Sequence, residues 1–162
     1  MTANRHYYTV DGSRSTELKP RVRPARELLE NLLTLMQPGK RSTLMLAPIP
    51  EAKNFVDYLH EGGSPVFLQC AGTSDAMTIE WHKYDDDGQD RHYIVGHGGD
   101  HSREPSVDIP FFDGTRKATV YPDEVFALDE ATDIFFHYYE TGEIPSGYEL
   151  RWYDLTWPKP QP

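Results

Sequence analysis

The amino-acid sequence predicts a single α+β domain, built as an antiparallel β-sheet with two main helices packed on one side. Two segments carry apolar residues at helical spacings of three and four, and several short strand-like runs lie between them. The resulting order of helix, several strands, helix and strand is typical of an α+β fold. The 162 residues, 38% of them hydrophobic, are enough for one hydrophobic core, so we expect one domain over residues 1–162.

The N-terminal part is predicted to be an extended segment followed by a helix. Residues 1–24 suit a short strand around Tyr7, and Pro24 disfavours a helix before it. A helix is predicted over residues 25–36, and Gly39 follows its end. Its broad apolar stripe consists of Leu28, Leu29, Leu32, Leu33, Leu35 and Met36.

The middle of the chain is predicted to form most of the sheet. Strand-like runs cover residues 42–47, 65–71, 77–84, 91–96 and 117–121. A short helix is expected over residues 51–60, between the first two strands. The third run alternates and places Met77, Ile79 and Trp81 on one face, while the Asp-Gly pair within residues 85–88 marks a turn. We therefore expect a hairpin with one buried face.

The C-terminal part is predicted to contain a long loop, a second helix and a last strand. Residues 97–115 are rich in Gly, Asp, Ser and Pro, and loops of this length are usually functional or mobile. Asp129 is a suitable N-cap for a helix over residues 130–141, and Gly142 a suitable end. A strand over residues 148–155 follows. The inner face of the helix is predicted to consist of Ala131, Ile134, Phe135 and Tyr138.

The net charge of −10 is the first indication of function. Residues 1–60 carry nine basic and six acidic side chains, whereas residues 61–162 carry seven basic and twenty acidic ones, a net of −13. This balance disfavours direct binding of nucleic acid, because few cations are present to replace phosphate counterions. An acidic face of this size attracts a basic partner, although it can also serve solubility alone.

The single cysteine excludes an internal disulfide and fits a reducing cytoplasm. Cys70 lies in an apolar strand, where a buried, inert thiol is the usual outcome. The N-terminal sequence has no continuous apolar stretch, so we expect no signal peptide, and no apolar run approaches the length of a transmembrane helix.

Two groups of polar residues are candidates for chemistry. His97, Asp100 and His101, with His92 nearby, could bind zinc, and a small metal-dependent hydrolase using these four residues is the alternative function. They lie in a Gly-rich loop, without the helical spacing or the cysteines that such sites use. No phosphate-binding loop or nucleophile motif is present. We therefore expect no enzymatic activity, no resident metal and no cofactor.

The second group is acidic and lies at the predicted hairpin tip. Asp85, Asp86, Asp87 and Asp90 do not match the alternating pattern of a calcium-binding loop. A solvated turn is the simple interpretation, and a contact surface for Lys or Arg of a partner is the sharper one.

The C-terminal third contains a characteristic series of segments: Tyr121-Pro122-Asp123-Glu124, Leu128-Asp129-Glu130-Ala131, Tyr139-x-Thr141-Gly142-x-x-Pro145 and Trp152. In these segments it resembles the Imm-one family of immunity proteins from bacterial polymorphic toxin systems. The resemblance implies a cytoplasmic protein that binds and neutralises one cognate toxin domain, often a nucleic-acid deaminase or nuclease. Such a toxin needs a basic groove for its substrate, which the acidic part of this chain would complement.

We therefore predict an inhibitor that covers the substrate groove of a toxin without catalysing a reaction. Its carboxylates would occupy positions that phosphates otherwise use, while a tyrosine and two histidines add packing and hydrogen bonds. The predicted toxin-binding residues are Asp85, Asp86, Asp87, Asp90, Tyr93, His97, Asp100 and His101. A protein-interaction domain with no toxin partner is a further alternative.

Overall fold

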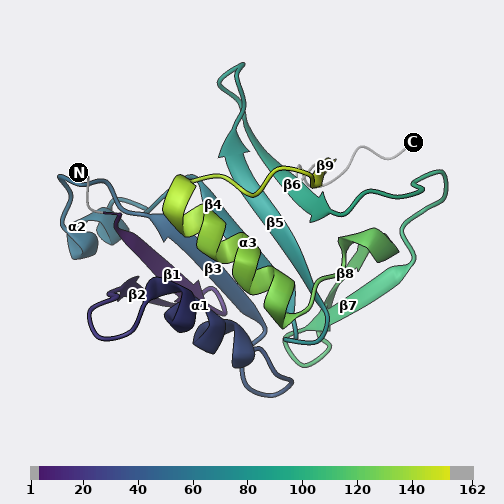
Figure 1. Ribbon diagram of the computed structural model, residues 1–162, viewed down its shortest axis with the longest axis horizontal. Coiled ribbons are helices and arrows are strands. Elements are labelled where there is room, and N and C mark those ends of the chain that lie inside the picture. The colour runs from purple at the N-terminus through teal and green to yellow at the C-terminus, as the bar shows by residue number, and fades with distance from the viewer. Residues whose placement is uncertain (1–3, 154–162) are drawn as a thin grey trace.

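The structure, a computed structural model, describes residues 4–153 and contains a seven-stranded antiparallel sheet in the order β2-β1-β3-β4-β5-β6-β9 (Figure 1). Its strands are β1 (His6–Val10), β2 (Arg14–Leu18), β3 (Thr43–Pro48), β4 (Phe67–Gly72), β5 (Met77–Tyr84), β6 (Asp90–Gly96) and β9 (Glu149–Tyr153). A separate two-stranded hairpin consists of β7 (Val107–Phe111) and β8 (Arg116–Val120). The helices are α1 (Ala25–Thr34), α2 (Phe55–His60) and α3 (Leu128–Thr141), with a 3₁₀ turn η1 (Pro122–Glu124). The predicted α+β fold class is confirmed.

Helices α1 and α3 lie on one face of the sheet, which we call the front face (Figure 1). Leu29 and Leu33 of α1 and Phe135 of α3 are fully buried against sheet residues such as Leu46 and Ile79. The predicted inner face of α3 is confirmed, and the burial of these apolar side chains is the main source of stability here. The prediction for α1 is wrong at its end, because the helix ends at Thr34 and Leu35, at the C-cap, is 41% exposed.

The opposite face of the sheet, the back face, is covered only in part. At one end, Phe55 and Leu59 of α2 pack against Tyr7 and Ala47. At the other end, the β7–β8 hairpin packs on Ile94 of β6. The back face between these two covers carries polar residues, among them Gln69 and Glu80, and a cleft opens over them.

The chain passes from the back face to the front face immediately before α3. Val125 packs with the β7–β8 hairpin, whereas Phe126 belongs to the main core. Phe126 exchanges both backbone hydrogen bonds with Met77, at 2.8 and 2.9 Å, and so forms an isolated antiparallel bridge at the start of β5. This crossing places η1 beside the end of β6.

The start of α3 differs from the sequence prediction. The helix begins at Leu128, and Ala127 stands at the N-cap without a side-chain hydrogen bond, so the prediction of Asp129 as the N-cap is wrong. Asp129 instead lies in the first turn, where its negative charge is favourable to the helix dipole. Gly142 ends the helix as predicted, with a left-handed φ of 78° that suits glycine.

The other helices are close to their predicted positions. α1 begins at Ala25, directly after Pro24. The short helix predicted over residues 51–60 begins only at Phe55, because the Asn54 side chain caps it by accepting from two backbone N–H groups.

Two strands were not predicted. β2 is a polar edge strand that pairs with β1, so the N-terminal extended segment over residues 1–24 is in part a hairpin. Charged edge strands resist aggregation but lack the apolar alternation that identifies a strand in sequence. β7 lies inside the predicted loop over residues 97–115 and contains Pro110, which is compatible with a strand only at an edge or bulge. The last strand, predicted over residues 148–155, is β9, and residues 154–155 lie outside the described residues.

Candidate functional site

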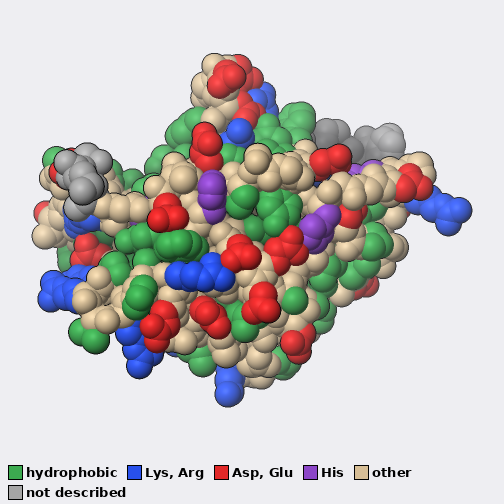
Figure 2. Space-filling view, viewed as in Figure 1, with side chains coloured by type: hydrophobic (Ala, Val, Ile, Leu, Met, Phe, Trp, Pro, Cys, Tyr) green, Lys and Arg blue, Asp and Glu red, His purple; other side chains and the backbone are tan. Residues whose placement is uncertain are grey.

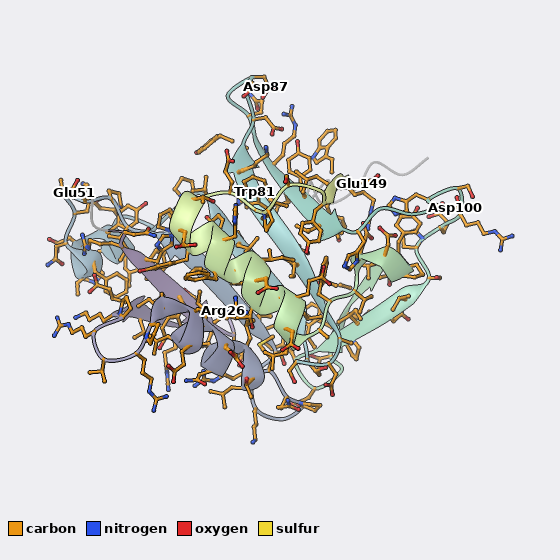
Figure 3. The ribbon with its side chains drawn as sticks, viewed as in Figure 1. Arg26, Glu51, Trp81, Asp87, Asp100 and Glu149 are labelled. Atoms are coloured by element: carbon orange, nitrogen blue, oxygen red, sulfur yellow. The ribbon has the colours of Figure 1, made fainter. Side chains whose placement is uncertain are left out.

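Seven of the eight predicted toxin-binding residues, all except Asp100, fall into two groups at opposite ends of β6. One group, the tip cluster, surrounds the β5–β6 hairpin and contains Asp85, Asp86, Asp87, Asp90 and Tyr93. The other, the base cluster, follows β6 and contains His97 and His101. β6 has seven residues, so the two ends lie about 20 Å apart. Figure 3 shows the labelled Asp87 and Asp100 far from one another, with Glu149 between them.

An ion-pair network organises the tip cluster. Arg91 lies 2.7 Å from a carboxylate oxygen of Asp85 and 2.8 Å from one of Asp87, and the hydroxyl of Tyr93 donates to Asp85. The Tyr93 and Arg91 hydrogen bonds hold the pKa of Asp85 below its usual range, and Arg91 does the same for Asp87. These two carboxylates are therefore already neutralised by the chain itself, whereas Asp86 is exposed and has no ion pair within residues 4–153.

Asp90 belongs to a different face of the hairpin. Its carboxylate lies 3.1 Å from Nε2 of His82, and the ring of His82 lies 3.6 Å from that of His92. Phe67 packs edge-on against both imidazoles. Burial and the neighbouring His82 lower the pKa of His92 to about 4, so this imidazole is neutral at neutral pH.

Aromatic and cationic side chains alternate on the front face of the hairpin. The Lys83 ammonium lies 4.7 Å from the centre of the Trp81 ring and 5.7 Å from that of Tyr93. The Arg91 guanidinium lies 5.4 Å from the ring of Trp152, whose side chain is 59% exposed. Lys83 and Arg91 are not among the residues predicted from the sequence. The hairpin register, in which they face one another, could have indicated them.

The base cluster begins with His97, which joins the end of β6 to α3. Its Nε2 lies 2.7 Å from Glu130, its Nδ1 lies 2.8 Å from the carbonyl oxygen of Asp123, and Tyr148 donates to Glu130 at 2.6 Å. Both imidazole partners are acceptors, so this geometry needs two N–H groups and favours the imidazolium. Partial burial opposes this, but the bonds to Glu130 and Asp123 outweigh it and raise the pKa of His97.

Asp123 holds the loop that follows β6. One carboxylate oxygen lies 2.8 Å from Nε2 of His101, and the other accepts from the backbone N–H of Gly98 at 3.1 Å. These bonds outweigh the effect of partial burial and lower the pKa of Asp123. His101 stacks on Tyr121 at 3.8 Å. Asp100 is exposed and accepts only from Ser102 among the described residues, so it lies outside this hydrogen-bonded group.

A buried ion pair completes the base cluster. Glu124 is 1% exposed and meets the guanidinium of Arg151 through two hydrogen bonds of 2.8 and 2.9 Å. Glu124 also accepts from the backbone N–H of Tyr121. The acidic residues that carry the family resemblance here thus connect η1 to β9, to α3 and to the loop after β6. A pocket of about 140 Å³ remains beside them.

The four residues of the alternative hydrolase are not brought together. His92 packs against His82 on the back face, while His97 and His101 each contact a different carboxylate. Within residues 4–153, no group of three or more His, Cys, Asp or Glu side chains is arranged to hold a metal ion. Cys70 is 1% exposed, as predicted, and burial raises the pKa of its thiol to about 12.

The surface of α3 is acidic. Asp129, Asp133 and Glu140 of this helix are exposed, and only Asp133 pairs with a cation of the described residues, Arg26 of α1 at 2.7 Å. Figure 2 shows carboxylates spread over the front face, and acidic and basic side chains together at the hairpin tip. The exposed carboxylates of α3 therefore lie on the front-face side of the molecule.

Comparison of the chain with protein-family models, with curated proteins and with solved structures finds no match. The resemblance to the Imm-one family stays a prediction, carried by the residues quoted above. Among the described helices, none combines the length and the apolar character that crossing a membrane requires.

Proposed function

We propose that this chain is an immunity protein that binds and neutralises a toxin domain of a bacterial polymorphic toxin system. It acts in the cytoplasm as a stoichiometric inhibitor without a cofactor, and its partner is a basic domain that acts on nucleic acid. The observation that carries this proposal is the projecting β5–β6 hairpin, whose tip combines acidic and exposed aromatic side chains on an ordered framework (Figure 1).

The composition of the tip is that of an interface centre. Trp, Tyr and Arg dominate the binding energy of protein interfaces, and Trp152, Tyr93 and Arg91 meet on the front face of this hairpin. Their mutual contacts, together with the Asp85–Arg91–Asp87 network, reduce the side-chain freedom that binding would otherwise remove. The tip is thus suited to enter a concave surface.

The charge distribution supports a basic partner. The net charge of −13 over residues 61–162 would accelerate the approach of a positively charged groove and make the association sensitive to salt. The exposed carboxylates of α3 extend this field beyond the tip.

Within this proposal the predicted residues divide by role. Asp86 and Asp90 face solvent and meet cations of the toxin. Asp100 contributes negative charge at the edge of the proposed interface, in the loop after β6. Asp85 and Asp87 keep Arg91 and Tyr93 in place, which is a positioning role. His97 and His101 hold the base cluster together through Glu130 and Asp123. Glu124 of the same cluster pairs with Arg151 of β9, the strand that carries Trp152.

Co-expression tests the proposal. Immunity genes of such systems normally lie directly after a large toxin gene, so the C-terminal domain encoded by the neighbouring large gene is the toxin to use. Expressed alone it should kill the host cell, and co-expression of this chain should restore growth. Trp152→Ala and the pair Asp86→Lys with Asp90→Lys should each reduce protection.

Glu51→Lys is the matched control for the charge reversals, since Glu51 is exposed and lies at the far end of the molecule (Figure 3). It should protect like the natural chain. Death of the cells despite abundant folded chain would contradict the proposal and favour an interaction domain with another partner. Protection unaffected by all three tip substitutions would move the contact surface away from the hairpin.

A further inference from the structure

A cleft of about 670 Å³ opens on the back face of the sheet, away from the tip and base clusters. Its floor is formed by side chains of β3, β4 and β5, and one wall by the β7–β8 hairpin. The turn between β1 and β2 closes a further side with Asp11 and Gly12. The volume lies in the range of small-molecule sites, and the proposed toxin contact makes no use of this cleft.

The floor of this back-face cleft presents hydrogen-bond acceptors. Gln69 of β4 and Glu80 of β5 stand directly opposite one another in the sheet, and Thr43 and Thr78 lie one row further along the same face. Neither a hydrogen bond nor an ion pair from the described residues reaches the carboxyl group of Glu80. Its other neighbour across the sheet is the apolar Ile94.

Glu80 is therefore a carboxyl group that the fold leaves without a partner. Removal of water from around it raises its pKa. Glu80 is half-buried and lines the cleft, so a ligand in the cleft can reach its carboxyl group and supply the missing partner.

The wall of the cleft presents aromatic faces. Phe111 and Phe112 line it with ring centres 5.5 Å apart, and Phe112 has a left-handed φ of 51°, which is unusual for a bulky residue. The backbone is held in this conformation because the N–H of Phe112 donates to Ser42 at 2.9 Å and its carbonyl accepts from Thr115 at 3.0 Å.

A guanidinium of the chain itself already packs against one of these rings. The guanidinium of Arg116 lies 5.7 Å from the centre of the Phe112 ring. A planar cation thus already lies beside one of the two rings at the rim, while the acceptors on the floor have no cation among the described residues.

We propose that the back-face cleft is a binding site for a guanidinium group, with Glu80 and Gln69 accepting its N–H donors and the aromatic wall of Phe111 and Phe112 packing against it. A guanidinium carries five donors in one plane, matches a carboxylate through two parallel bonds and stacks on aromatic rings. A single guanidinium fills only part of 670 Å³, so the cleft also accommodates the chain that carries it. The carrier is either a free guanidino compound or an arginine side chain of another protein.

Titration of the isotopically labelled full chain with N-acetyl-arginine amide, followed by NMR, tests this site. We expect saturable shifts of amides in residues 67–80 and 107–120. N-acetyl-citrulline amide, which has nearly the same shape but no charge, should bind at least tenfold more weakly. Absence of saturable shifts with the arginine probe, or equal affinity for the citrulline probe, would overturn the proposal.

Variants assign the binding to the cleft. Glu80→Gln removes an unpaired carboxyl, so it should fold at least as well as the natural chain while losing at least tenfold in affinity for the arginine probe. Glu51→Gln, the same change at an exposed distant position, should bind normally. Arg116→Gln removes a like charge from the rim and should tighten binding a few-fold. Normal affinity of a folded Glu80→Gln chain would refute the site.

A peptide arm distinguishes the two carriers. The probe acetyl-Gly-Arg-Gly-amide should bind as tightly as the single residue if the cleft accepts an arginine side chain from a protein. Weaker binding of the peptide alone supports a free guanidino compound. Neither result depends on the toxin, so failure of this site leaves the immunity proposal unaffected.

Discussion

Replacement of Arg151 by methionine tests whether the buried ion pair holds β9 to the rest of the fold. Glu124 is 1% exposed, so its carboxylate depends on the two hydrogen bonds of 2.8 and 2.9 Å that it receives from Arg151. Hydrogen bonds to charged groups contribute about 1.5–3 kcal/mol each, and loss of one partner of a buried pair costs about 3–5 kcal/mol. The bond from the Tyr121 backbone persists in the variant. We therefore expect Arg151→Met to lower the free energy of unfolding by about 3–5 kcal/mol.

Urea unfolding followed by circular dichroism measures this loss, and thermal unfolding should show a decrease in Tm of roughly 10 °C. Arg91→Met is the matched control, because Arg91 also binds carboxylates but at the solvated hairpin tip, and its loss should be much smaller. Adding Glu124→Gln to Arg151→Met should recover part of the stability, since it removes the unpaired charge. A loss for Arg151→Met no larger than that for Arg91→Met would refute the reasoning.

Three further predictions concern groups buried in the fold. His6 is 4% exposed, and burial lowers its pKa from 6.5 to about 4, so the unfolded chain takes up a proton before the folded chain does as pH falls. Up to about 3 kcal/mol of stability should therefore be lost between pH 6.5 and pH 4. Urea midpoints measured against pH should fall less steeply for His6→Gln than for the natural chain. Gly72→Ala would place a Cβ 2.5 Å from the carbonyl oxygen of Ala76 at a φ of 125°. The free energy of unfolding, measured in urea, should therefore fall by at least about 1 kcal/mol. An unchanged urea midpoint would contradict the close packing around Gly72. Cys70 should react with a thiol reagent only after denaturation, and rapid labelling of the native chain would show that β4 is not buried as described.

The sequence predicted those parts of the fold in which local pattern and burial agree. The alternation over residues 77–84 identified β5 with its correct bounds, and the Leu-rich stripe after Pro24 identified α1. The helix α3 was predicted to begin at residue 130 but begins at Leu128. The prediction failed because an aspartate such as Asp129 is as favourable in the first turn of a helix as at its N-cap. β7 was missed because Pro110 is compatible with a strand only where no neighbouring strand needs its N–H.

The candidate site was predicted as a set of residues but not as an arrangement. Sequence alone could not show that Arg91 forms ion pairs with both Asp85 and Asp87, although the position of all three residues in one predicted hairpin indicates that they lie close together. The pair of Glu124 with Arg151 joins residues 27 positions apart, and it exists only because η1 folds back beside β9. The cleft around Glu80 likewise depends on how the β7–β8 hairpin sits on the sheet, which no local pattern determines.

The affinity of this chain for the C-terminal domain encoded by the neighbouring large gene, the proposed toxin, tests the central claim most directly when it is measured by calorimetry over a series of salt concentrations. We expect a one-to-one complex whose dissociation constant rises with salt, and a weaker, less salt-dependent complex for the chain carrying Asp86→Lys and Asp90→Lys. Absence of a complex with the active toxin domain, or an affinity indifferent to both salt and these reversals, would contradict the claim that an acidic hairpin of this protein occupies a basic groove.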